Sequence, residues 1–149
     1  MNKLIAEEII ANMFYNGCIY EAKEIAVDAF QKLFSEIADD ELYDHYAQLK
    51  KWALDNGYDV PFKLKDLEKY ADACVKQLNA LKSAKKLAYY IDEAIKSEQD
   101  AIKSYEAALK TDDLPYDLNA IMLQNYYDEV SHLDNLTFLK YAIEAEDVA

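Results

Sequence analysis

The stretch "YYDEVSHLDNL", residues 126–136, places Glu129 three residues before His132, one of only two histidines in the chain. Residues three or four apart share a helix face. Glu and His at this spacing most often form a surface pair. Here, however, steps of four and three trace a stripe with apolar ends and a polar centre: Leu118, Met122, Asn125, Glu129, His132, Leu136, Leu139 and Ile143. The stripe favours a buried position for both polar groups.

Three other segments carry the same kind of stripe, each with one Glu on an otherwise apolar line. The first reads Leu4, Glu8, Ala11, Tyr15, Cys18, Ala22 and Ile25, and another reads Ala84, Leu87, Ile91, Ala94, Glu98, Ala101, Tyr105 and Ala108. Both contain E-x-x-A-x-x-x-Y, starting at Glu8 and at Glu98. The remaining stripe runs through Phe30, Phe34, Ile37 and Glu41 to Asp44 or His45, with Leu49 and Trp52 beyond.

The composition predicts an all-α fold, because Gly and Pro number only two each and a β-rich chain needs more turn residues. Breaks at "DNGYDVP" and "TDDLP", with a capping-box pattern at Asp28 and Gln31, divide the chain into helices at about residues 2–24, 28–56, 82–110 and 115–145. Residues 58–81 are themselves helix-compatible and would form a long crossover. We expect one domain over residues 1–149: a four-helix bundle of two antiparallel hairpins.

Charge and hydropathy exclude several classes of partner. Asp and Glu number 29 against 16 Lys and Arg, and the net charge of -13 opposes binding to nucleic acid or anionic lipid. No apolar run approaches the length of a membrane span, and the amino terminus does not resemble a signal peptide. We therefore expect a cytoplasmic protein in which the isolated Cys18 and Cys74 are reduced.

The four Glu residues should meet at one height in such a bundle. Two residues of an antiparallel pair are level when the turn lies midway between them. The midpoint of residues 98 and 129 is 113.5, inside "TDDLP", and that of residues 8 and 41 is 24.5, just before the capping box. Four buried carboxylates cannot all stay ionised without cations. A dinuclear site with carboxylate and imidazole ligands, which suit iron or manganese, satisfies this requirement.

With these motifs the sequence resembles the ferritin-like superfamily, in particular its rubrerythrin and bacterioferritin branch. "DEVSHLDNL" is similar to that branch's last-helix motif, and "EQDAIKSYE" to its E-x-x-A-x-x-x-Y helix. By this resemblance Glu8 and Glu98 match the first- and third-helix ligands. Glu41 matches the second-helix Glu, and Glu129 with His132 the fourth-helix pair. The resemblance covers the four helices, most of the chain.

The second helix departs from the family pattern. Where the family has His three residues after its Glu, this chain has Asp44, and His45 follows one position later. The 13-residue distance from Asp44 to Gly57 matches the family and favours Asp44 as the ligand. Continuity with the apolar Leu49 and Trp52, together with ligand chemistry, favours His45. A π-bulge in the helix would accommodate His45.

The resemblance implies a site with two iron ions, or manganese or mixed metals, that oxidises Fe(II) or reduces dioxygen or hydrogen peroxide. Glu8 and Glu98 would be terminal or chelating ligands, with Glu41 and Glu129 as bridges. His132, with His45 or Asp44, would supply the outer ligands. Haem is not expected, because Leu42 stands where bacterioferritin has its haem-binding Met. We expect a homodimer or higher homo-oligomer, with an external electron donor where the reaction needs one.

Two questions stay open from the residues alone. Tyr15 and Tyr105 lie on the ligand stripes, either as core residues with a polar tip or as hydrogen-bonding groups around the site. The competing functions are an iron-storage subunit of an oligomer and a metal-free helical interaction module.

Overall fold

Four helical rods form the part of the chain that the structure describes. The computed structural model describes residues 1–22, 28–60, 68–69, 72 and 83–148, and the elements assigned in that part are all helical. They are α1 (Asn2–Glu21), α2 (Asp28–Asp39), the π-helix η1 (Asp40–Tyr46), α3 (Ala47–Asp55), α5 (Ser83–Leu109) and α6 (Tyr116–Val148). Because α2, η1 and α3 are contiguous, they make one continuous rod. The all-α, four-helix expectation is confirmed.

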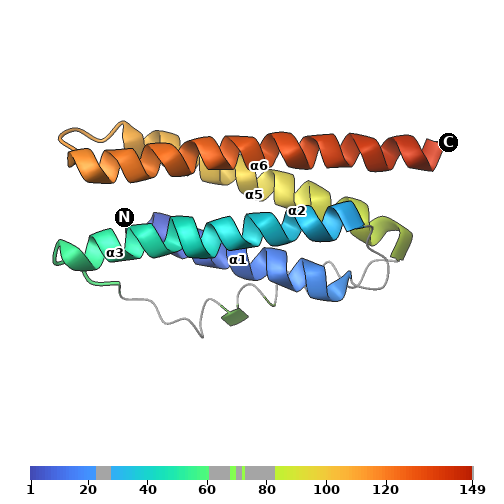
Figure 1. Cartoon of the computed structure of the whole chain (residues 1–149), viewed down its shortest axis with the longest axis horizontal. Helices are drawn as coiled ribbons and strands as arrows, with labels where there is room; N and C mark the ends of the chain where they lie inside the picture. The colour runs from blue at the N-terminus through green and yellow to red at the C-terminus, as the bar shows by residue number, and fades with distance from the viewer. Residues whose placement is uncertain (23–27, 61–67, 70–71, 73–82, 149) are drawn as a thin grey trace.

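The rods pair as two antiparallel hairpins (Figure 1). α1 packs against α2 and η1, and α5 packs along α6. Further contacts of α1 with α5 and of α2 with α6 join the hairpins into one bundle. α3 ends and α5 begins at opposite ends of the bundle, as a long connection between the hairpins requires (Figure 1). The helix-compatible stretch predicted at residues 58–81 lies largely outside the described residues.

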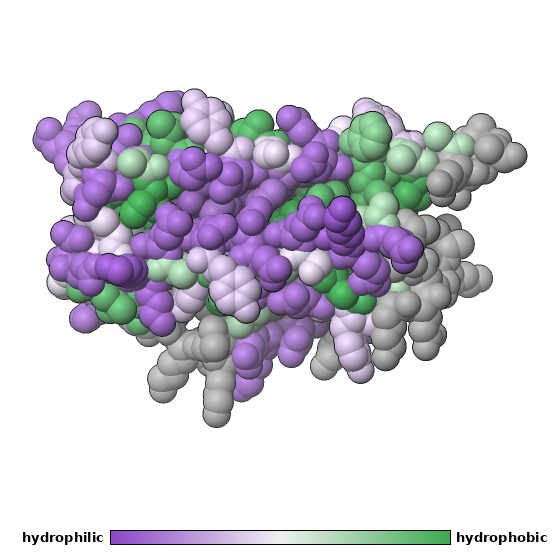
Figure 2. Space-filling model, viewed as in Figure 1, coloured by the Kyte–Doolittle hydropathy of each residue, from purple (hydrophilic) through white to green (hydrophobic). Residues whose placement is uncertain are grey.

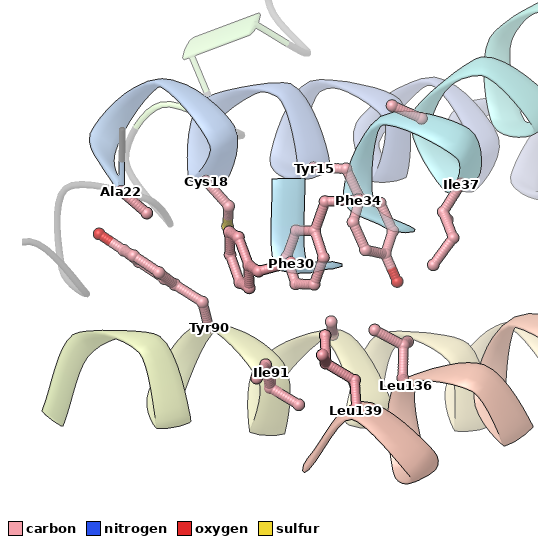
Figure 3. Close-up of a cluster of buried hydrophobic side chains, with 12 residues drawn as sticks. Tyr15, Cys18, Ala22, Phe30, Phe34, Ile37, Tyr90, Ile91, Leu136 and Leu139 are labelled. Carbon is pink, nitrogen blue, oxygen red and sulfur yellow. The ribbon is translucent and has the colours of Figure 1, made fainter. Parts of the chain in front are cut away.

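Two apolar clusters fill the bundle on either side of its middle. The aromatic cluster consists of Tyr15, Cys18, Ala22, Phe30, Phe34, Ile37, Ala38, Tyr90, Ile91, Ala94, Leu136 and Leu139 (Figure 3). The Trp52 cluster consists of Leu4, Ile5, Leu49, Trp52, Ala53, Tyr105, Leu118 and Met122. In each rod, the predicted Glu lies between the residues of one cluster and those of the other. Burying a large apolar side chain stabilises the fold by about 1.5–3 kcal/mol. The two clusters therefore hold the four rods in alignment on both sides of the polar residues.

The second rod ends at the glycine where the sequence predicts a break. Gly57 has φ +80°, a left-handed conformation that glycine adopts without strain. Its N–H donates to the carbonyl oxygen of Leu54 at 3.2 Å, and the N–H of Tyr58 donates to that of Ala53 at 2.9 Å. These two bonds form a Schellman motif. At the other end of this rod, the side chain of Gln31 donates to the carbonyl oxygen of Ile19 at 3.5 Å, a contact between helices.

The surface agrees with the high content of charged residues. Hydrophilic side chains cover much of the face seen in Figure 2. Among the described residues, no helix has both the length and the apolar character of a membrane span. Cys18 is a free, buried thiol. Cys74 lies outside the described residues.

Candidate metal centre

Six titratable side chains from the four rods meet in the middle of the bundle. They are Glu8, Glu41, His45, Glu98, Glu129 and His132, each 5% exposed or less. All six come from the stripes that the sequence analysis singled out. The level positions expected from the hairpin midpoints are therefore present in the fold.

These side chains form two overlapping groups, each able to hold a metal ion. In each group, one ligand atom per residue lies within 4.8 Å of all the others. The first group is Glu8, Glu41, His45 and Glu129, and the second is Glu41, Glu98, Glu129 and His132. Glu41 and Glu129 belong to both. Because a carboxylate has two oxygens, each of these two residues can serve both groups at once.

The structure separates the two candidates in the second rod. His45 is fully buried and belongs to the first group, whereas Asp44 is exposed and belongs to neither. The reason is the π-helix η1, whose wider turn carries an extra residue relative to an α-helix. This wider turn brings His45, four residues after Glu41, onto the core face. Asp44, three residues after Glu41, stays exposed.

Two aspartates hold the imidazole rings in a crossed arrangement. His45 Nε2 is 2.9 Å from Asp128 Oδ2, and His132 Nε2 is 2.8 Å from Asp40 Oδ2. Each Asp immediately precedes the shared Glu of one rod and bonds the His of the other rod. With Nε2 held by an Asp, the Nδ1 atom of each ring faces the carboxylates, as in metal sites where an outer carboxylate orients a His ligand.

Sequence reasoning assigned no role to Asp40 or Asp128. The signal that could have found them is the dipeptide Asp-Glu, which occurs in both "DDELYDH" and "YDEVSH". A crossed contact between distant rods, however, is not visible from either segment alone.

Two tyrosines make a second crossed arrangement, on α1 and α5. Tyr15 of α1 donates its hydroxyl hydrogen to Glu98 Oε1 at 2.7 Å, and Tyr105 of α5 donates to Glu8 Oε1. The Asn125 amide donates to the Tyr105 oxygen at 3.2 Å. Both rings are also core residues of the two apolar clusters. The repeated E-x-x-A-x-x-x-Y motif thus becomes a pair of reciprocal Tyr–Glu hydrogen bonds.

Positive charge stabilises this cluster of buried carboxylates. Burial and the negative charge of Glu129 raise the pKa of Glu98 well above its usual value. Burial opposes the imidazolium form of His45, but hydrogen bonds with Glu129 and Glu41 outweigh it and raise its pKa to about 11. The pKa of His132 is also raised, because its hydrogen bond with Asp40 and the nearby site carboxylates outweigh burial. Glu98 and the two imidazoles therefore retain protons unless other cations replace them.

Unsatisfied atoms test whether cations fit these residues. Four buried atoms of the site have no hydrogen-bond partner among the described residues: Glu41 Oε1, Glu98 Oε2, Glu129 Oε2 and His132 Nδ1. A buried polar atom without a partner costs about 1–3 kcal/mol. All four are atoms of the kinds that bind metal ions, and they belong to the four residues of the second group. The donor set therefore fits cation binding.

No family model, curated protein or solved structure significantly matches this chain. The class of protein is therefore defined by the fold and the site themselves. It is an all-α bundle of four helices whose interior holds two overlapping Glu/His groups that could bind metal ions.

Proposed function

We propose that this protein is a di-iron carboxylate oxidoreductase that oxidises Fe(II) with dioxygen or hydrogen peroxide, in iron handling or defence against oxidants. The observation that carries the proposal is the sharing of Glu41 and Glu129 between two four-residue groups. Because the two groups share two carboxylates, they suit one dinuclear site better than two independent metal sites. The mixture of carboxylate oxygen and imidazole nitrogen suits iron or manganese.

The roles of the residues follow from membership of the groups. Glu41 and Glu129 would bridge the ions. Glu8 and His45 would complete one metal position, and Glu98 and His132 the other. The four carboxylates carry a charge of -4, which two divalent ions balance when both imidazoles are neutral. A pair of ions thus removes the main cost of burying these acids.

The protein would position the reaction, and the metals would carry the electrons. A bound iron pair would supply two electrons on oxidation from Fe(II) to Fe(III), enough to reduce one hydrogen peroxide to two waters with two protons. Asp40 and Asp128 hold the imidazoles, and Tyr15 and Tyr105 hold the terminal carboxylates. The two apolar clusters exclude water along the bundle axis on both sides.

Anaerobic titration with Fe(II), followed by exposure to oxygen or peroxide, tests the proposal. We expect about two ions per chain and, after oxidation, the near-ultraviolet absorption of an oxo-bridged ferric pair. Glu129→Gln is the matched control, since it keeps the side-chain shape but removes one bridging charge. Wild-type protein that binds no Fe(II) or Mn(II), and is not stabilised thermally by either, would instead support a metal-free interaction module.

A further inference from the structure

A cavity of about 350 Å³ lies between α1 and α5 and reaches the site. Four site carboxylates, Glu8, Glu41, Glu98 and Glu129, contribute to its lining. The rest of the lining includes Glu7, Glu93, Lys96, Asp100 and Ala101. At roughly 30 Å³ per water, the volume is far larger than dioxygen or peroxide needs and can admit an ion with its hydration shell.

The side of the site opposite this cavity is formed by η1 and α6, which carry the two imidazoles. There the two imidazoles are covered by Asp40 and Asp128, whose carboxylates lie 2.8 and 2.9 Å from the ring nitrogens. An ion entering from that side would have to break a partly buried His–Asp hydrogen bond. Access from the α1–α5 side requires no such rearrangement.

The polar groups of the cavity form a gradient from its outer to its inner end. Glu93 and Asp100 are exposed. Glu7 is half-buried, accepts a hydrogen bond from Ser104 at 3.3 Å and lies 3.8 Å from the ammonium of Lys3. Further in, the unpartnered oxygens of Glu41, Glu98 and Glu129 are buried and can accept a cation. Lys96 also belongs to the lining, so the lining of the outer end carries three acids and one base, with Lys3 beside Glu7 as a second base.

We propose that this cavity is the route by which hydrated divalent cations reach the dinuclear site, and that Glu7, Glu93 and Asp100 form an outer carboxylate station on that route. The ion meets the outer acids with its water shell intact and exchanges those waters for the inner carboxylates. This inference rests on the proposed function, because a route matters only if the site binds metal.

Stopped-flow binding of Co(II), followed by its visible absorption under anaerobic conditions, tests the outer station. The test variant is E7Q/E93Q/D100N. The control is E36Q/D112N/D134N, which removes the same number of charges from exposed positions outside the cavity lining. At low salt we expect association about 10-fold slower in the test variant and less than about 2-fold slower in the control, since local charge steers association. The final stoichiometry should remain two ions.

A second variant tests the route without changing charge. Ala101→Leu places a larger apolar side chain in the cavity lining. An obstructed route slows entry and exit by the same factor, so both Co(II) association and chelator-driven release should slow about 5-fold or more, with the dissociation constant unchanged. Circular dichroism checks that the bundle is intact.

The outcomes separate this inference from the proposed function. Equal slowing in the test and control triple variants would mean that overall charge attracts the ion, and would overturn the outer station. Unchanged rates in folded Ala101→Leu would overturn the route. Both of these results presuppose that the wild type binds two ions, whereas no Co(II), Mn(II) or Fe(II) binding at equilibrium would overturn the proposed function itself.

Discussion

The π-helix η1 and the middle of α6 supply the same chemistry with different spacing. Glu41 and His45 are four residues apart in η1, whereas Glu129 and His132 are three apart in α6. Both pairs are nonetheless buried, and each Glu belongs to both metal-ligand groups. The two imidazole rings lie 6.0 Å apart with an angle of 28° between them.

This difference shows that a helix can absorb an extra residue without losing its core face. Beyond η1, Leu49, Trp52 and Ala53 are buried again. The wider π turn therefore acts as a local insertion, and the helix continues in register on both sides. Helix geometry, and not residue spacing alone, sets which side chains reach the site.

Deleting one residue from each segment should have the most different effects on stability. Deletion of Asp44 restores three-residue spacing, so η1 can become α-helical with its core residues in place, at a cost of about 1 kcal/mol or less. Deletion of Ser131 rotates the rest of α6 by about 100° and removes Leu136 and Leu139 from the core, costing at least about 4 kcal/mol. Urea denaturation measures both. Equal destabilisation would contradict the insertion interpretation.

Neutralising the shared carboxylates tests whether the two segments are equivalent. Glu41→Gln and Glu129→Gln should each weaken binding of both ions at least about 100-fold, or about 2.7 kcal/mol, since each residue serves both groups. Glu8→Gln and Glu98→Gln are the matched controls and should each impair one ion only. Calorimetric titration with Mn(II) gives stoichiometry and affinity. Retention of two tight ions in Glu41→Gln would refute the bridging role.

The crossed aspartates allow each imidazole to be weakened from the opposite segment. Asp128→Asn should loosen His45, and Asp40→Asn should loosen His132, each lowering metal affinity about 10- to 100-fold. Combining Asp128→Asn with His45→Ala should add little, because the Asp acts through that imidazole. Combining Asp128→Asn with His132→Ala should be close to additive. A double-mutant cycle from metal titrations measures this, and additivity in both pairs would exclude the crossed arrangement.

The raised pKa values of the two histidines predict an alkaline loss of stability in the chelator-treated protein. The unfolded chain releases the His45 proton near pH 6.5, but the folded chain holds it to about pH 11. The folded state therefore binds more protons in this range, so the stabilising contribution is complete below pH 6.5 and falls as pH rises toward 11. Unfolding free energy should fall by up to about 1.4 kcal/mol per pH unit for each such group. Denaturation curves at pH 6–9 test this, and His45→Gln should flatten the slope.

Asp44 should give the smallest effect. Because it is exposed and lies outside both groups, Asp44→Ala should change stability by less than about 0.5 kcal/mol and leave two ions bound. His45→Ala is the paired variant and should lose an ion. Thermal denaturation with and without Mn(II) measures both. A larger metal effect from Asp44→Ala than from His45→Ala would reverse the assignment drawn from η1.

Much of the site could be predicted because it lies on regular helices. Glu98, Glu129 and His132 follow from their positions in apolar stripes, and the midpoint argument places them level across the α5–α6 turn. The π-helix could be anticipated only as a condition for His45, since an extra residue can be absorbed in several ways. Asp40 and Asp128 were missed, because each acts on a residue about 83–92 positions away.

The amino-acid sequence predicts the helices, their antiparallel pairing and the polar centre of each stripe, since helix periodicity and turn residues are local properties. Only the tertiary structure decided that His45 turns inward in place of Asp44, which aspartate holds which imidazole, and that α1 and α5 leave a cavity beside the carboxylates. The physical reason is that these features depend on how four rods rotate and pack against one another. Many rotations are compatible with one stripe, and the packing of both apolar clusters selects among them.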